Sequence, residues 1–245
     1  PFIAKPEDAG IVAGRILLRM KEPIKIETHE LFTSMSIGIA IFPEDGITEQ
    51  TLIQNADTAL YSAKAAGKNQ FAFFKKQMNS SVLRRMDIEN NLRNALEKDQ
   101  FQLFYQPQIN LKSGKIIGME TLIRWIHPEW GIVSPVEFIP VAESSGMIIP
   151  IGEWVIRDAC QQWSRWQAQG YNPAKLSINL SAIQFKNEGL SEVIQSIIEE
   201  TGIATDSLVF EITESALMLD AESTLTQLHA LKKLGVRLSV DDFGT

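Results

Sequence analysis

The sequence predicts an α/β protein built from repeated strand–helix units, preceded by a smaller α+β block. Strands and helices alternate from residue 87 onward, which is typical of a largely parallel sheet with helical crossovers. Three glycines, Gly170, Gly202 and Gly235, each stand just past an expected helix, where helices commonly end. Three apolar strands, "LSINLS", "LVFEIT" and "RLSVDD", each carry an acid or an amide near the carboxyl end.

The first block, residues 1–76, has a helix–strand–helix–strand pattern. Apolar residues at helical spacing in "PEDAGIVAGRILLRMKEP" predict a helix that ends at the proline. The β-rich residues 33–41 predict a strand followed by a turn. The stretch "TEQTLIQNADTALYSAKAAG" predicts an amphipathic helix with Gly67 past its end, and "QFAFF" predicts a closing strand.

Residues 77–86 connect this block to a second domain. They are polar with weak periodicity, so we expect a linker or a helical connector. Beyond them, apolar residues recur on one face of a helix, at Ile88, Leu92, Ala95 and Leu96. The second domain is therefore expected to span residues 87–245.

The second domain is expected to alternate strands with helices along its whole length. The expected strands are residues 102–109, 116–125, 175–180, 208–213 and 237–240. The expected helices are residues 152–169, 190–201 and 221–234. In barrels built from repeated β/α units, catalytic residues gather at the carboxyl ends of the strands. Functional residues are therefore expected at those ends.

Composition excludes several classes of function. The 245 residues carry a net charge of −7 and no Lys/Arg-rich tract, which argues against binding to duplex DNA or RNA. No stretch of about 18 apolar residues is present, so no membrane-spanning segment is expected. The single cysteine, Cys160, fits a buried core position. With no recognisable signal peptide, the chain is expected in the cytoplasm, alone or as the cytoplasmic part of a longer sensor.

Polar side chains stand at the ends of several expected strands. They are Glu120, Asn179, Glu211, Asp241 and Asp242. Oxygen ligands that converge from several strands suit Mg²⁺ or Mn²⁺, and neighbouring strands lie about 4.8 Å apart. Two such ions can hold a phosphodiester and activate a water molecule. The pattern therefore predicts a site for two divalent cations.

These residues also have structural interpretations. A single strand glutamate is usually exposed, an asparagine after a strand is often a turn residue, and an aspartate pair after a strand often caps the next helix. Their combination at successive strand ends favours the metal site. Two further polar residues, His127 and Glu143, are interpreted as structural, the latter as a hydrogen-bonding acid.

Four motifs, in this order and spacing, resemble the EAL family of cyclic-di-GMP phosphodiesterases. They are "FQLFYQPQINLKSGKIIGMETLIRWIHPEWGIVSPVEFIPVAESSGMI", "SINLSA", "FEITES" and "VDDFGT". The resemblance implies a modified (β/α)₈ barrel whose first strand is antiparallel to its neighbours. It further implies metal-dependent hydrolysis of cyclic di-GMP to linear pGpG, and a homodimer formed through this domain.

The resemblance also assigns catalytic and metal-binding roles. It makes metal ligands of Glu120, Asn179, Glu211, Asp241 and Asp242, with Asp241 as the bridge between two ions. Glu214 matches a glutamate that holds the loop after the aspartate pair. In the alternative interpretation, Glu214 is an acid in the first turn of a helix, favoured by the helix dipole.

Substrate contacts are implied for three further residues. Arg124 matches an arginine that binds a phosphate oxygen, a role that suits guanidinium, although a surface salt bridge is the alternative. Gln106 matches a substrate contact or is a simple turn residue, and Leu122 would pack near a guanine base. The Glu-Ala-Leu signature reads Glu120-Thr121-Leu122 here. Because strand neighbours point to opposite faces, Thr121 is expected to leave the ligand geometry intact.

The N-terminal block resembles the C-terminal part of a GGDEF domain, through "SIGIAIFPEDG" and "ADTALYSAKAAGKNQF". The signature loop of that family is absent, which argues against diguanylate cyclase activity. The EAL-like part stops after five of eight barrel strands, before the family's lysine and later ligands. The chain is therefore expected to be a piece of a longer protein and inactive alone. The alternative function is an inactive module that binds cyclic di-GMP or docks a partner, although all five ligands within its length are kept.

Overall fold

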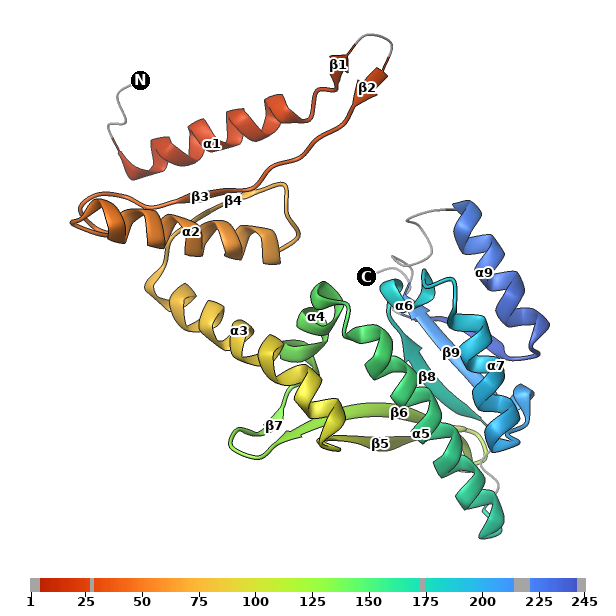
Figure 1. Cartoon of the computed structure of the whole chain (residues 1–245). Coiled ribbons are helices and arrows are strands. Elements are labelled where there is room, and N and C mark those ends of the chain that lie inside the picture. The colour runs from red at the N-terminus through yellow and green to blue at the C-terminus, as the bar shows by residue number, and fades with distance from the viewer. Residues whose placement is uncertain (1–4, 27–28, 172–174, 214–220, 242–245) are drawn as a thin grey trace. The chain divides into compact units, whose positions relative to one another are not determined.

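The computed structural model describes residues 5–26, 29–171, 175–213 and 221–241 (Figure 1). The chain divides into two compact units, Pro1–Asp87 and Ile88–Thr245. No helix in these ranges combines the length and the apolar content needed to cross a membrane.

The first unit packs two helices against a pair of parallel strands. Its elements are α1 (Pro6–Met20), β1 (Ile24–Ile26), β2 (His29–Leu31), β3 (Ile37–Ile39), α2 (Glu49–Ala65) and β4 (Phe71–Phe73). The helices and the closing strand lie where the sequence predicts them. The strand expected over residues 33–41 is shorter, with only β3 paired in parallel to β4. An antiparallel hairpin of β1 and β2, which the sequence analysis did not predict, precedes it.

Helix α3 (Lys76–Glu97) begins in the first unit and ends in the second. The strands of the second unit are β5 (Phe101–Ile109), β6 (Ile116–His127), β7 (Gly131–Val133), β8 (Leu176–Leu180), β9 (Leu208–Thr213) and β10 (Arg237–Asp241). Its helices are α4 (Pro135–Ser145), α5 (Ile148–Ala168), α6 (Ala182–Phe185), α7 (Leu190–Thr201), the 3₁₀ turn η1 (Thr205–Ser207) and α9 (Ala221–Lys233).

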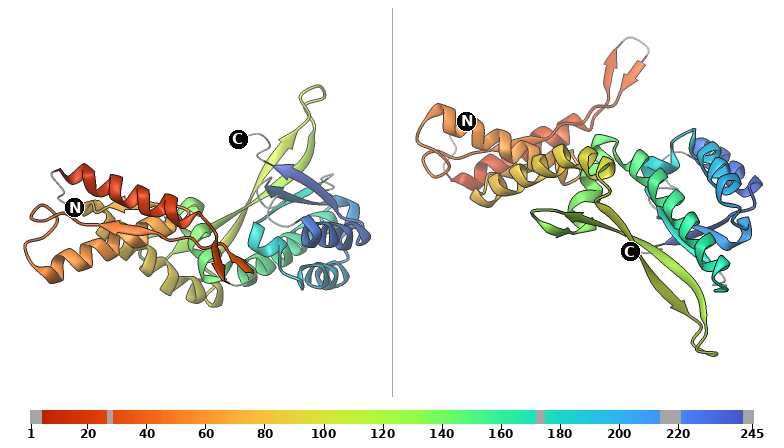
Figure 2. Two further views of the ribbon diagram at one scale, coloured as in Figure 1. Left: turned by 90° about the horizontal axis from the view of Figure 1, so that it is seen from above. Right: turned by 60° about the horizontal axis from the view of Figure 1, so that its bottom comes forward.

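One sheet organises the second unit, with the strand order β10-β9-β8-β6-β5 and with β7 paired to β6. Strand β5 is antiparallel to β6, whereas β6, β8, β9 and β10 run parallel. Figure 2 shows the β5–β6 pair as a long twisted ribbon. The antiparallel first strand, followed by parallel strands with helical crossovers, confirms the predicted fold class.

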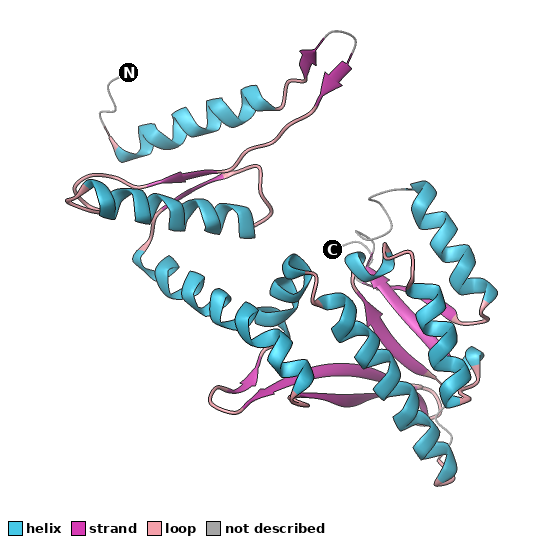
Figure 3. Ribbon diagram, viewed as in Figure 1, coloured by secondary structure: helices cyan, strands magenta, loops and turns pink. Residues whose placement is uncertain are grey.

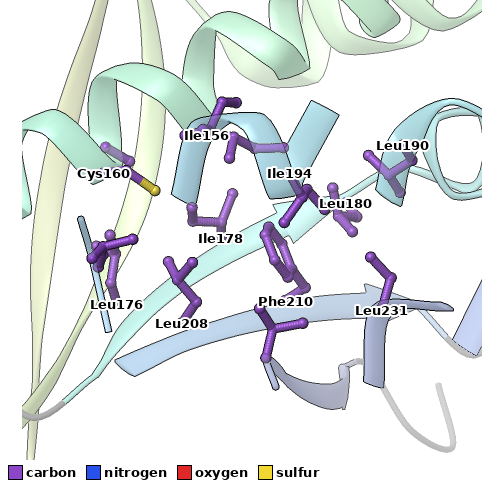
Figure 4. Packing of buried hydrophobic residues seen from close by; sticks show 14 of the residues in the cluster. Ile156, Cys160, Leu176, Ile178, Leu180, Leu190, Ile194, Leu208, Phe210 and Leu231 are labelled. Atoms are coloured by element: carbon purple, nitrogen blue, oxygen red, sulfur yellow. The ribbon is translucent and has the colours of Figure 1, made fainter. Parts of the chain in front are cut away.

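Helices α5 and α7 cover one face of strands β8 and β9 (Figure 3). Alternate strand residues point into this core, where they meet apolar residues of both helices (Figure 4). The strand residues that belong to this core are Leu176, Ile178, Leu180, Leu208, Phe210 and Ile212. Cys160 is buried in the same cluster, as expected, and burial raises the pKa of its thiol to about 12. Because strand residues alternate, the residues between these point to the opposite face.

A second cluster joins α3, α4 and the start of α5 to strands β5 and β6. Trp125 is fully buried there and packs edge-on against Phe138. His127 is structural, as expected, because its Nδ1 accepts the backbone N–H groups of Glu129 and Trp130 at 3.2 and 3.3 Å. The sequence analysis predicted neither α4 nor α6.

Candidate functional site

Strand β6 places two sets of side chains on opposite faces. Thr121 is only 4% exposed and Trp125 is fully buried against the helices. Between them, Leu122 and Arg124 are half-buried, as is Glu120 before them. The alternation puts Glu120, Leu122 and Arg124 on one face of β6 and Thr121 on the other, as predicted.

Glu120 and Asn179 contact each other across adjacent strands. The Asn179 Nδ2 atom donates a hydrogen bond to Glu120 Oε1 at 3.0 Å. The backbone of Asn179 pairs with that of Glu211 in the β8–β9 ladder. Three of the predicted ligands therefore come from β6, β8 and β9 and gather along one edge of the sheet.

The remaining predicted ligands extend this edge only in part. The backbone of Asp241 pairs with Thr213, and Ser239, two residues earlier, pairs with Glu211. The side chain of Asp241, and both Asp242 and Glu214 entirely, lie outside the described residues. Across the ranges that the structure does describe, no three His, Cys, Asp or Glu side chains form a metal-binding group.

The chemistry of the residues at this edge fits a hard divalent cation. Glu120 and Glu211 offer carboxylate oxygens. Turning the Asn179 amide by half a rotation exchanges Nδ2 for Oδ1 and brings an oxygen next to the Glu120 carboxylate. An all-oxygen donor set is what Mg²⁺ and Mn²⁺ prefer.

A cavity of about 330 Å³ opens at the same edge. Arg124 and Leu122 line it from β6, Asn179 and Glu211 line it from β8 and β9, and apolar residues of α4 and α5 form much of its wall. Its volume lies in the range typical of small-molecule sites, about 300–1,000 Å³. An apolar cavity with a few convergent polar groups suits a ligand that has both flat apolar and anionic parts.

Arg124 supplies a positive charge to this cavity. Its guanidinium lies 5.7 Å from the centroid of the Phe104 ring, and Nη1 donates to the carbonyl oxygen of Ile123 at 2.8 Å. No salt bridge joins Arg124 to a carboxylate anywhere in the described part of the chain. The alternative interpretation as a surface salt bridge is therefore not supported, and the guanidinium remains available to an anion.

Gln106 lies within strand β5, directly across the ladder from Glu120. Its side chain is exposed, and it is not part of the cavity lining. The alternative interpretation as a turn residue is wrong, because Gln106 is paired within a nine-residue strand.

Glu143 is a cavity residue that the sequence analysis interpreted differently. It lies on α4 and lines the cavity, and burial raises the pKa of its carboxyl group. No hydrogen bond to its carboxylate is found among the described residues, so the expected structural hydrogen-bonding role is not observed. The hydroxyl of Thr121, which also lines the cavity, is buried without a hydrogen-bond partner among the described residues. A prediction of α4 would have pointed to Glu143, because the helix carries it over the strand ends.

Comparison with known families gives two matches along the chain. Residues 89–245 match the EAL domain model, and residues 4–70 match the model of the diguanylate cyclase GGDEF domain. The structure and the family matches thus concern the same two parts of the chain.

Two curated relatives match nearly the whole chain. The bifunctional diguanylate cyclase/cyclic di-GMP phosphodiesterase MucR of Pseudomonas aeruginosa is 40% identical over 241 residues, which is 98% of this chain. The cyclic di-GMP phosphodiesterase PdeR of Escherichia coli K12 is 38% identical over 234 residues, or 96% of this chain. The chain spans only 35% of the length of either relative.

Solved structures are similar as well. A cyclic-di-GMP complex of the MucR phosphodiesterase matches with a TM-score of 0.62 and 40% identity, over 65% of this chain and 64% of that one. The cAMP-bound form of the EAL enzyme Bd1971 matches with a TM-score of 0.62 and 31% identity, over 81% of this chain and 55% of that one.

Proposed function

The chain belongs to the EAL domain family, preceded by part of a GGDEF domain, and on this premise we propose that the full-length protein hydrolyses cyclic di-GMP to linear pGpG with divalent metal ions. The observation that carries the proposal is the contact between Glu120 and Asn179 at the cavity edge, 3.0 Å apart. Two oxygen-bearing side chains from different strands, beside a cavity lined by an arginine that forms no salt bridge among the described residues, support a phosphodiesterase site.

Five residues would hold the metal ions in this proposal. They are Glu120, Asn179, Glu211, Asp241 and Asp242. When bound, the ions would activate the attacking water and stabilise the charge that develops on the phosphate. Glu214 would position the loop after the aspartate pair, and together with Glu120, Asp241 and Asp242 it belongs to the catalytic set.

The cavity residues would bind and orient the nucleotide. Arg124 would donate to a phosphate oxygen through its planar guanidinium, which matches two oxygens at once. Leu122 and the apolar wall from α4 and α5 would pack against a guanine base and exclude water. Gln106, across from Glu120 on β5, would contact the substrate from the neighbouring strand. The solved complex of the MucR phosphodiesterase with cyclic di-GMP, at 40% identity to this chain, supports this ligand.

Metal removal is the direct test of the proposal. Treatment of the full-length protein with a chelator should abolish conversion of cyclic di-GMP to pGpG, and Mg²⁺ or Mn²⁺ should restore it. Ca²⁺ should support binding but little turnover, because its larger and looser coordination holds the attacking water poorly. The measurement is chromatographic quantification of pGpG, with Asn179→Ala as the ligand variant and Leu111→Ala, at a fully exposed position, as its control.

The outcomes separate the two functions that the sequence leaves open. Full hydrolysis after exhaustive chelation contradicts the proposed chemistry. Tight binding of cyclic di-GMP without pGpG under any metal would instead assign a binding module.

A further inference from the structure

The backbone of Asn179 pairs with strand β9 on one side, whereas the β6–β8 ladder on its other side ends before it. The β6–β8 pairing covers Met119 to Thr121 and ends at Ile178, one residue before Asn179. On the β9 side the pairing continues through Leu180. The reach of Asn179 toward Glu120 is therefore set by β9 and by the turn that follows β8.

That turn is held by a reciprocal pair of hydrogen bonds between Ser181 and Gln184. The Ser181 backbone N–H donates to Gln184 Oε1 at 3.1 Å, and the Gln184 backbone N–H donates to Ser181 Oγ at 3.2 Å. The pair forms a capping box at the start of α6, which is only four residues long. A helix this short has little stability of its own, so the box and its burial fix the end of β8.

Gln184 is also seated against helix α5. It is 6% exposed, and a Cβ atom added to Gly152 would lie 1.8 Å from Gln184 Nε2. Glycine inside a helix is less favourable than alanine, and here it leaves room for the amide. Gln184 is thus anchored to the turn through Oε1 and to α5 through Gly152, and it lines the cavity that Asn179 lines.

We propose that Gln184, seated on Gly152, is a positioning residue that sets the distance from Asn179 to Glu120 and so the metal affinity of the site. The inference rests on the proposed function, because it concerns the same metal ligands. Gln184 itself contacts the turn and α5, and it acts through Asn179. Its loss should therefore weaken metal binding without removing a ligand.

Two variants of Gln184 isolate the hydrogen bond from the volume. Gln184→Met keeps the length of the side chain and loses the acceptor, whereas Gln184→Glu keeps the acceptor for the Ser181 N–H. We expect Gln184→Met to raise the dissociation constant for Mn²⁺ about 10- to 100-fold, the usual effect of losing a partner behind a metal ligand. Gln184→Glu should stay close to the wild type. Calorimetric titration of the full-length protein with Mn²⁺ measures both.

A variant at Gly152, the residue of α5 against which Gln184 packs, tests the same proposal. Gly152→Ala should displace the Gln184 amide and weaken Mn²⁺ binding in the same direction, while favouring the helix itself. Gly189→Ala is the matched control, because an added Cβ there meets nothing closer than Asn187 Oδ1 at 4.0 Å. The far-ultraviolet circular dichroism spectrum of Gly152→Ala should match that of the wild type, whereas a general loss of structure would alter it.

Crystal structures of the variants provide a measure that is independent of activity, namely a longer distance from Asn179 Nδ2 to Glu120 Oε1. If the wild type binds Mn²⁺ and hydrolyses cyclic di-GMP but Gln184→Met and Gly152→Ala bind Mn²⁺ equally well, the inference alone is overturned. If Gln184→Glu weakens Mn²⁺ binding as much as Gln184→Met does, the hydrogen-bond acceptor of Gln184 has no role in positioning Asn179. If the wild type neither binds Mn²⁺ nor hydrolyses the nucleotide, the proposed function fails and the inference with it.

Discussion

At the residue scale, Arg124 is the residue that we propose to bind an anionic ligand in the cavity. The chain carries a net charge of −7, so an anion needs a local positive charge. The Arg124 guanidinium lies near the Phe104 ring and is joined to no carboxylate in the described ranges. This arrangement leaves its charge unneutralised where the phosphate is proposed to bind.

Replacement of Arg124 by alanine should weaken binding of cyclic di-GMP by roughly 1.5–3 kcal/mol, the range for a hydrogen bond to a charged group. The affinity of Arg124→Lys for cyclic di-GMP should lie between those of the wild type and Arg124→Ala, because lysine keeps the charge but lacks the planar pair of donors. Calorimetry in the presence of Ca²⁺ measures binding without turnover. Arg93→Ala, at an exposed position on α3, is the control. An unchanged dissociation constant for Arg124→Ala would rule out the assigned contact.

Asp158 on α5 shows the opposite situation, a carboxylate whose charge is disfavoured. Burial raises the pKa of Asp158, while the nearby Arg165 partly offsets this. The Tyr105 hydroxyl is buried and has no hydrogen-bond partner in the part of the chain that the structure describes, and burial together with the charge of Asp158 raises its pKa. Because the folded state holds the Asp158 proton more tightly than the unfolded state does, this carboxyl lowers stability as pH rises.

The pH dependence of stability tests this interpretation of Asp158. Below the ordinary carboxyl range, near pH 4, wild type and Asp158→Asn should have similar melting temperatures. As pH rises through the raised pKa, the wild type should lose stability relative to the variant, and the difference should then level off. Melting curves from pH 3 to 8 measure this. A difference that shrinks with rising pH would mean that Arg165 stabilises the charged form.

At the element scale, β3 and α2 pack closer together than side chains allow. A Cβ atom on Gly38 would lie 2.0 Å from the backbone oxygen of Ala56 and 2.4 Å from the backbone nitrogen of Leu60. Both atoms belong to the helix backbone, so neither can rotate away. The glycine therefore fixes the distance between the strand and the helix.

Substitution of Gly38 by alanine should push α2 away from β3 and destabilise the first unit by about 1–3 kcal/mol, the usual cost of overpacking. Hydrogen exchange of the α2 amides should accelerate accordingly. Gly14→Ala, on α1, is the matched control, because its added Cβ meets only the Phe71 ring at 4.0 Å. Slower or unchanged exchange in α2 for Gly38→Ala would show that the contact relaxes freely.

Helices and strands with a regular spacing of apolar residues were predictable from the sequence, whereas elements that depend on tertiary contacts were not. Strand β9 and helix α7 have the bounds that their patterns predict. Helix α4 was not predicted, because Pro140 inside it is typical of a helix break, although a proline at the first helical position is compatible with a helix. Helix α3 begins at Lys76, so of the two alternatives for residues 77–86 the helical connector is the correct one. The polar first half of the helix shows little periodicity, which left the choice open.

The candidate site was predictable where it depends on strand alternation. Glu120, Asn179 and Glu211 are polar residues of neighbouring strands: register pairs Asn179 with Glu211, and a side-chain hydrogen bond joins Asn179 to Glu120. The supporting residues were not predictable. Gln184 packs against Gly152, which is about thirty residues away in the sequence, so no local sequence pattern indicates this contact.

At the scale of the second unit, the sheet has the hydrophobic core on one face and residues of the proposed site on the other. The face toward α5 and α7 is apolar and buried, whereas the opposite face carries Glu120, Arg124 and Glu211. Each strand serves both faces in alternation. A change in the core can therefore reach a proposed metal ligand through a single peptide unit, as between Phe210 and Glu211.

Phe210 gives the test of this coupling, because it is fully buried at the centre of the cluster formed by α5, α7, α9, β8 and β9. Phe210→Ala should cost about 3–5 kcal/mol of unfolding free energy, from lost burial and the cavity left behind. Since the cluster is continuous, hydrogen exchange should accelerate in all five elements together. Leu111→Ala, at a residue 98% exposed, should change stability by less than about 0.5 kcal/mol. Faster exchange confined to β9 would show that these elements open independently, and the sheet would then not act as one unit.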